Sequence, residues 1–146
     1  MNLINFFKKG VIKGIYLGMP IVDFNKTKLH KKVTDTIYAF EDDDSYFINS
    51  TSIGIEITFF NEKIESISID PNYENFSLQS LKITRHTSLL DILKKYNKNK
   101  INWKFNCRNK NNECEIVTLN PHTSIIFTFE KDEFWMSKIV LSQYSA

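Results

Sequence analysis

Residue types able to perform acid–base or nucleophilic chemistry are present, but they do not form a recognisable catalytic motif. The three histidines fall at an expected helix end, in a loop before an expected helix and in an expected turn; they are His30, His86 and His122. The chain has no Gly-rich phosphate loop, nucleophile elbow, zinc signature or EF-hand loop. Asp and Glu are plentiful, so folding could still assemble a catalytic pair. We expect no catalytic residues, and an enzyme stays open as the alternative.

The cysteines and the apolar runs indicate a compartment. Cys107 and Cys114 are the only cysteines, and they lack further Cys or His partners at zinc spacing. A disulfide between them is possible, but without an export signal we interpret them as reduced thiols. The apolar run 3–7 precedes Lys8 and Lys9, the reverse of a secretory signal, and no run approaches the roughly 20 residues that span a bilayer. We expect a cytoplasmic protein with no metal, cofactor or membrane contact.

Lysines gather near the ends of two expected helices. They are Lys26, Lys28, Lys31 and Lys32, and later Lys94, Lys95, Lys98 and Lys100. Such clusters can bind phosphate groups, but cations are also favourable at helix C-termini because of the helix dipole. The formal net charge of only +2 favours the second explanation. We therefore expect no direct binding to nucleic acid.

The densest charge on the chain is acidic and follows an expected strand. Glu41, Asp42, Asp43 and Asp44 are consecutive, and Tyr46 comes at the start of the next strand. The simpler interpretation is a solvated β-turn. The alternative is a surface that attracts a basic partner over about 8 Å at physiological salt. If so, changing the three Asp residues to Asn should slow association, while each change alters stability by roughly a few tenths of a kcal/mol.

An aromatic pair, Phe134 and Trp135, falls at the expected tip of the last hairpin. Buried packing would explain the pair, and an exposed Trp anchor in a protein interface is the alternative. We expect the acidic run, Tyr46 and this pair to supply the partner-binding residues.

Alternating apolar residues predict the elements that position these groups. Residues 53–70 alternate on both sides of a break at 61–62, which predicts an antiparallel hairpin with one buried face. Residues 124–143 repeat the design around a break at 131–133. Inward-pointing side chains are expected at Ile55, Ile57, Phe59, Ile125, Phe127 and Phe129.

The predicted order is strand, helix and four antiparallel strands, occurring twice. The two units cover about residues 10–71 and 77–144 of one composite domain that spans 1–146. Each unit alone would bury little surface, so the two are expected to share a core. The fold class is therefore predicted as α+β, with two tandem β-α-β-β-β-β units and two helices packed on one face of a mainly antiparallel sheet.

Local signals place the two helices and the less regular segments. Pro20 begins a helix that continues to position 33, and Ser88 with Asp91 is the capping-box signature of the second helix. Residues 78–83 are expected to form one short strand, and 107–114 an Asn-rich loop. A short helical turn is expected within 1–10.

The run Gly14-Ile15-Tyr16-Leu17-Gly18-Met19-Pro20, with Val22 and Phe24 after it, resembles the helix entry of small bacterial proteins built from such units. The tandem layout is similar to that of the β-lactamase inhibitor protein, and each unit to the small outer-membrane assembly lipoproteins. The chain departs from those lipoproteins in lacking their lipobox cysteine, and His86 occupies the position of Gly18 in the second unit. Many proteins of this kind resemble immunity proteins of contact-dependent growth inhibition or other polymorphic toxin systems.

The resemblance implies a monomer that binds a cognate toxin domain one to one, with a nuclease among the candidate toxins. The leading hypothesis is therefore an immunity protein that neutralises a toxin by direct binding and occlusion. The alternative is a small enzyme or ligand-binding protein with a pocket between helices and sheet. A deep pocket with two or more convergent titratable groups would favour the alternative.

Overall fold

The structure, a computed structural model, describes residues 1–33, 37–39, 45–50, 53–73, 76–108 and 112–143. The elements, in chain order, are α1 (Ile4–Lys9), β1 (Val11–Ile12), β2 (Ile15–Tyr16), α2 (Ile21–Phe24), α3 (His30–Val33), β3 (Ile37–Ala39), β4 (Ser45–Ser50), β5 (Ile55–Phe60), β6 (Lys63–Ile69), β7 (Phe76–Leu78), β8 (Leu81–Ile83), α4 (Leu89–Lys98), β9 (Trp103–Arg108), β10 (Glu113–Leu119), β11 (His122–Glu130) and β12 (Glu133–Ser142). The paired strands are antiparallel, so the predicted α+β class with a mainly antiparallel sheet is confirmed.

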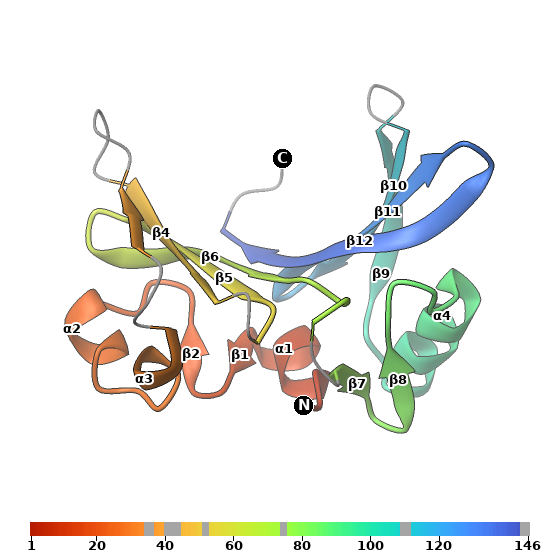
Figure 1. Cartoon of the computed structure of the whole chain (residues 1–146). Coiled ribbons are helices and arrows are strands. Elements are labelled where there is room, and N and C mark those ends of the chain that lie inside the picture. Colours follow the sequence, from red (N-terminus) through yellow and green to blue (C-terminus); the bar gives the residue numbers. More distant parts are fainter. Residues whose placement is uncertain (34–36, 40–44, 51–52, 74–75, 109–111, 144–146) are drawn as a thin grey trace.

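Eight strands form one sheet in the order β3-β4-β5-β6-β12-β11-β10-β9. The N-terminal half supplies four strands in chain order, and the C-terminal half supplies four in reverse order. The halves join where 66–69 of β6 pair with 139–142 of β12, and we call this junction the seam. Beyond the seam the two halves diverge (Figure 1). The strands β1 and β2, and likewise β7 and β8, form separate two-stranded hairpins.

Apolar side chains fill the space beside the sheet. In Figure 1 the four labelled helices and the two small hairpins lie along one side of the eight-stranded sheet. Ring centroids are 5.3 Å apart between Phe24 of α2 and Phe59 of β5, and 5.2 Å apart between Phe7 of α1 and Tyr96 of α4. The predicted inward positions are fully buried at Ile55, Ile57, Phe59, Ile125 and Phe127.

The predicted burial of Phe129 is wrong, because 47% of this residue is exposed. Alternate strand residues share a face, so Phe129 lies on the same face as buried Phe127. However, β11 and β12 continue for three residue pairs beyond the pair of Phe127 and Met136. The hairpin therefore extends past the core and carries Phe129 with it.

The helix predicted over 20–33 is interrupted, because the structure has the two short helices α2 and α3 in this range. Thr27 lies between them. Its hydroxyl donates to the carbonyl oxygen of Phe24 at 2.7 Å and accepts from the N–H of His30 at 3.2 Å. A threonine side chain can satisfy backbone groups outside a continuous helix, which explains the break.

Two other local predictions also differ from the structure. The strand predicted over 78–83 is a hairpin, in which β7 and β8 are joined by a turn at Gln79 with φ of 56°. The loop predicted over 107–114 is shorter, because β9 continues to Arg108 and β10 begins at Glu113. In both places the run of residues is short, and its own sequence does not show where a strand ends. Strand pairing depends on contacts with the opposite strand.

The helical turn predicted within 1–10 and the helix start predicted at Ser88 are confirmed. Helix α1 provides the expected turn within 1–10 and buries Phe6 and Phe7. Ser88 is the N-cap of α4, and its hydroxyl accepts from the N–H of Asp91 at 3.1 Å. These signals are local, so they are legible without knowledge of the tertiary contacts.

Candidate functional site

The end of the β11–β12 hairpin exposes a pair of aromatic rings. Phe129 and Phe134 are directly opposite each other, with ring centroids 4.3 Å apart. Phe134 also stacks on Phe127 at 4.9 Å, so the pair continues the core outward. Phe129 is 47% and Phe134 40% exposed. We call these two residues the exposed pair.

Charged side chains surround the exposed pair. A surface depression of about 510 Å³ is lined by Asn112, Phe129, Glu130, Lys131, Asp132, Glu133 and Phe134. Three of these side chains are acidic and one is basic. The N–H of Phe129 donates to the carbonyl oxygen of Asn112 at 2.9 Å, which ties the hairpin to the start of β10. The result is an apolar patch with an acidic rim.

Trp135 lies on the other face of the hairpin, because successive strand residues point to opposite faces. It is half-buried, and the guanidinium of Arg85 lies 5.2 Å from its ring centroid. The carbonyl oxygen of Arg85 also accepts from the N–H of Met136 at 2.8 Å. The structure therefore does not bring Phe134 and Trp135 into one patch. Trp135 packs against the β8–α4 connection, whereas Phe134 is part of the exposed pair.

The acidic run predicted to bind a partner, residues 41–44, lies outside the described residues. Tyr46 lies in β4 with its Cα opposite that of Phe59, and its side chain is likewise outside the described part. Strands β5 and β6 separate β4 from β12 in the sheet. Strand β12 pairs with β6 only over 139–142, so Phe134 lies beyond the seam, on the half of the sheet that does not contain Tyr46.

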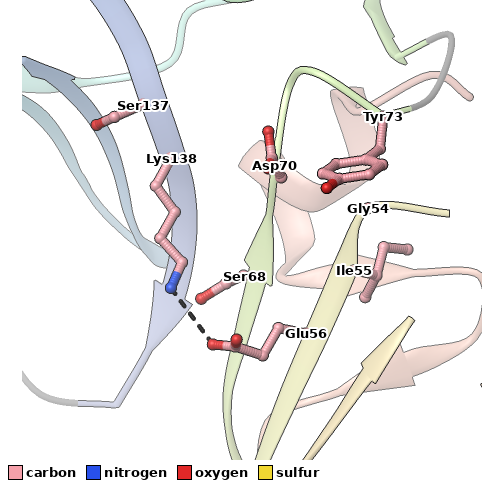
Figure 2. A pocket seen from close by; sticks show the side chains of 8 residues that line it. All are labelled: Gly54, Ile55, Glu56, Ser68, Asp70, Tyr73, Ser137 and Lys138. Carbon is pink, nitrogen blue, oxygen red and sulfur yellow. Dashed lines mark hydrogen bonds and ion pairs between the residues drawn. The ribbon is translucent and has the colours of Figure 1, made fainter. Parts of the chain in front are cut away.

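A second candidate, which the sequence did not reveal, is a polar cavity of about 220 Å³ beside the seam. Figure 2 shows Lys138 of β12 reaching toward Glu56 of β5, with Ser68 of β6 beside them. The Nζ of Lys138 lies 3.3 Å from Oε1 of Glu56. Asp70 and Tyr73 lie on the other side of the cavity.

The cavity wall is held by close backbone packing. Gly54 has φ of +65°, and a Cβ there would lie 2.6 Å from Cβ of Tyr73 and 2.9 Å from the carbonyl oxygen of Asp70. Only glycine fits this position without a shift. Oδ1 of Asp70 accepts from the N–H and from the side-chain amide of Asn72, at 2.8 and 2.9 Å. Gly54 is the one signal of this site that the sequence shows. Glu56 and Lys138 are 82 positions apart, so their spacing does not indicate that they meet.

The seam cavity can hold a small polar group, but not every side chain that lines it is directed into it. Ser137 points away from it and donates to the carbonyl oxygen of Ile126 at 3.1 Å (Figure 2). The volume of the seam cavity is below the roughly 300 Å³ at which pockets for drug-sized ligands begin. Within the described ranges, no three His, Cys, Asp or Glu side chains are grouped so that they could hold a metal ion.

The three histidines line neither the exposed pair's depression nor the seam cavity. His30 packs its ring edge-on against Phe24 at 5.5 Å, and His122 begins β11. His86 lines a shallow depression with Lys82 and Arg85.

None of the described helices is long and apolar enough to cross a membrane.

Comparison of the chain with models of protein families, with curated proteins and with solved structures found no match.

Proposed function

We propose that this protein binds and occludes a partner protein, in the manner of an immunity protein that neutralises a toxin. The observation that carries the proposal is the exposed pair at the end of the β11–β12 hairpin. Aromatic side chains that remain accessible on a rigid strand lose little conformational freedom on binding. They are therefore over-represented among the residues that dominate protein interfaces.

The chemistry around the exposed pair supports a partner with a basic surface. Glu130, Asp132 and Glu133 flank the two rings, against one Lys131. Peripheral charges of one sign speed the encounter with an oppositely charged partner, and a buried apolar centre slows dissociation. A nuclease toxin has such a basic surface, because it must bind the phosphates of its substrate. The proposed mechanism is steric occlusion in a one-to-one complex.

We also infer that the scaffold consists of two tandem units, about 10–71 and 77–144, with their helices on one face of the sheet. Phe59 pairs with Ile64, and a register shift comes directly before Phe59. Phe127 pairs with Met136, again with a register shift directly before it. The N–H of Ile64 donates to the Met19 carbonyl oxygen at 3.0 Å, and the N–H of Met136 to Arg85 at 2.8 Å. This correspondence supports the tandem arrangement.

Co-expression with the products of the genes adjacent to this one, tested for toxicity, tests the function. This protein and the toxic product should form a one-to-one complex by light scattering, and the protein should restore growth. Phe134→Ala should weaken binding about thirty-fold, because a central aromatic contributes about 2 kcal/mol or more.

Phe60→Ala is the matched control, because Phe60 is also 40% exposed but lies at the end of the other hairpin. It should leave binding unchanged. Equal losses for the two variants would remove the exposed pair from the interface, and no protection against any neighbouring toxin would refute the function.

A second candidate function, binding of a small polar ligand, is supported by the seam cavity. Glu56, Asp70 and Lys138 converge there from three segments. A ligand site requires titratable side chains that converge in this way. Free amino acids, which carry both charges, are suitable probes in a thermal-shift assay. A rise in the melting temperature that Asp70→Asn removes would favour this function, and no rise with any amino acid would exclude it.

A further inference from the structure

Three chain segments that are far apart in the sequence surround a cavity of about 570 Å³. They are the C-terminal end of α1, the residues that follow α4, and the turn between β10 and β11. The volume falls within the roughly 300–1,000 Å³ typical of small-molecule sites. It is separate from the exposed pair and from the seam cavity, and shares no lining residue with them.

Glycine brings the end of α1 against the β10–β11 turn. Gly10 ends the helix with φ of 65°, and its N–H donates to the Phe6 carbonyl oxygen at 3.0 Å. A Cβ on Gly10 would lie 3.2 Å from Cβ of Pro121, so the helix end and the turn are in close contact. This contact fixes Lys8 and Lys9 at the cavity.

The end of α4 places a third lysine at the same cavity. The backbone N–H of Ile101 donates to the Tyr96 carbonyl oxygen at 2.9 Å, and the backbone N–H of Lys100 donates to the Asn97 carbonyl oxygen at 3.1 Å. Lys100 has φ of 54° in this helix-ending turn, where glycine is the usual residue. Lys100 shares this positive φ with other described residues that are not glycine, such as Lys13 and Gln79, so the conformation alone does not indicate a function.

The charge at the cavity is of one sign. Its lining contains Lys8, Lys9 and Lys100 but no Asp or Glu. In the part of the chain that the structure describes, none of the three forms an ion pair. Lys26 and Lys94 differ, because their Nζ atoms lie 2.9 Å from Asp23 and 3.8 Å from Asp91.

Hydrogen bonding at the end of α4 does not account for Lys100. The last carbonyl groups of α4 already accept from the backbone N–H groups of Lys100 and Ile101. The side-chain amide of Asn99 also donates to the Lys95 carbonyl oxygen at 2.8 Å. These carbonyl groups therefore do not require the ammonium of Lys100. Lys8 and Lys9 lie in the last turn of α1, where the helix dipole also favours cations.

The rest of the lining combines apolar and amide groups. Phe7 and Ile101 are largely buried lining residues, and Leu119 is 52% exposed. The exposed side-chain amides of Asn102 and Asn120 add neutral donors. A ligand that satisfies this lining has an anionic group for the lysines and an apolar body for Leu119.

We propose that this cavity binds a small phosphate ester with a planar aromatic ring, the chemical class to which nucleoside monophosphates belong. The phosphate lies among Lys8, Lys9 and Lys100, because the ammonium of lysine is an effective point charge for phosphate. The ring of the ester rests on Leu119 and Ile101. This site is independent of partner occlusion, so its test does not involve the toxin.

The test is an NMR titration of isotope-labelled protein with AMP, and with adenosine and inorganic phosphate as its two halves. AMP should shift the amides of residues 99–102 and 118–120, which line the cavity. It should bind at least about five-fold tighter than either half, because both contacts contribute. The absence of AMP binding at about 10 mM, or equal affinities for AMP and phosphate, would overturn the proposal.

Lysine variants separate a defined site from general charge attraction. Lys9→Gln and Lys100→Gln should each lower the AMP affinity about five- to ten-fold. Lys26→Gln and Lys94→Gln make the same charge change elsewhere and should leave it unchanged. An equal loss in all four variants would overturn the site. Binding of a single-stranded oligonucleotide about a hundred-fold tighter than AMP would assign the lysines to nucleic acid instead.

Two further variants test the backbone and the apolar contact. Lys100→Gly should raise the melting temperature, because glycine suits the positive φ, and yet weaken AMP binding. Leu119→Ser should weaken AMP binding while phosphate binding stays the same. If Lys100→Gly binds AMP as well as the natural protein does, or if Leu119→Ser weakens both ligands equally, the proposed geometry is wrong.

Discussion

The β5–β6 and β11–β12 hairpins have the same design but differ at their ends. After the pair of Phe59 and Ile64, β5 and β6 continue for one more pair before the turn. After the pair of Phe127 and Met136, β11 and β12 continue for three more pairs. The two extra pairs include Phe129 and Phe134.

The segments that dock beside the hairpins explain why this difference matters. Before α2, the N–H of Gly18 donates to the Ile64 carbonyl oxygen at 2.7 Å, and the N–H of Ile64 donates to the Met19 carbonyl oxygen at 3.0 Å. Phe24 of α2 covers Phe59. The chain before α4 docks at Met136. Because docking occurs at the corresponding pair in both hairpins, the longer one extends beyond its cover. An aromatic pair is therefore buried or exposed according to hairpin length, not residue type.

Removing the cover from the first hairpin should have the largest effect. Phe24→Ala should cost about 3–5 kcal/mol of the free energy of unfolding, because Phe24 is fully buried. Urea denaturation measures the loss, and a dye that binds apolar surface should report the exposed Phe59. Val22→Ala, on the same helix but 62% exposed, should change stability by less than about 0.5 kcal/mol. Similar losses for the two variants would contradict the packing.

Two phenylalanines on one face of β11 give a sharper comparison. Phe127→Ala should cost about 3–5 kcal/mol, whereas Phe129→Ala should cost less than about 1 kcal/mol. The predicted difference of roughly 2–4 kcal/mol reflects burial alone, since residue type and strand are the same. Chemical unfolding of both variants measures it. A difference near zero would show that Phe129 is packed, and would remove the exposed pair.

The two turns should respond alike, because they share a conformation. Asn61 and Glu62 in the first turn, and Lys131 and Asp132 in the second, all have positive φ. Glu62→Gly and Asp132→Gly should each stabilise the protein by about 0.5–1 kcal/mol in thermal unfolding, by relieving the left-handed strain. Glu133→Gly, one residue into β12, should destabilise it by a similar amount. If Asp132→Gly destabilises the protein as well, the turn has another conformation.

The smallest effect at neutral pH is expected at Tyr96, through which α4 contacts the second half of the sheet. Burial raises the pKa of Tyr96 well above its usual value of 10.0. Its hydroxyl lies beside Thr123 without a well-aligned hydrogen bond. Tyr96→Phe should therefore change stability by less than about 1 kcal/mol, because no partner is left unpaired.

The pH dependence supplies the second readout for Tyr96. The unfolded chain releases this proton near pH 10.0 and the folded chain only at higher pH, so the stabilising contribution is present below pH 10.0. It is lost as the pH rises from there toward the folded-state pKa. Thermal melts from neutral pH upward should show a steeper alkaline decline in the natural protein than in Tyr96→Phe. Parallel declines would show that Tyr96 is accessible to water.

Sequence alone was sufficient for features set by neighbouring residues. Alternation identified the two long hairpins and five of the six inward side chains, including Phe59 and Phe127, because a strand with one buried face has a period of two residues. The cap at Ser88 was legible because its hydrogen bond spans three residues. The break in the helix at Thr27 was missed, because helical spacing of apolar residues continued across it.

The tertiary structure decided which groups meet. Phe129 is exposed because β11 and β12 extend past the docked segments, and hairpin length relative to a cover is not a local property. Glu56 meets Lys138, and Lys100 and Lys8 come to line one cavity, only after strands and helices from both halves have packed together. Alternation and capping report interactions within a few residues, whereas a cavity is formed by segments brought together through core burial. The two cavities of this protein therefore could not be read from spacing along the chain, and of the exposed pair only Phe134 was named in advance as a partner-binding residue.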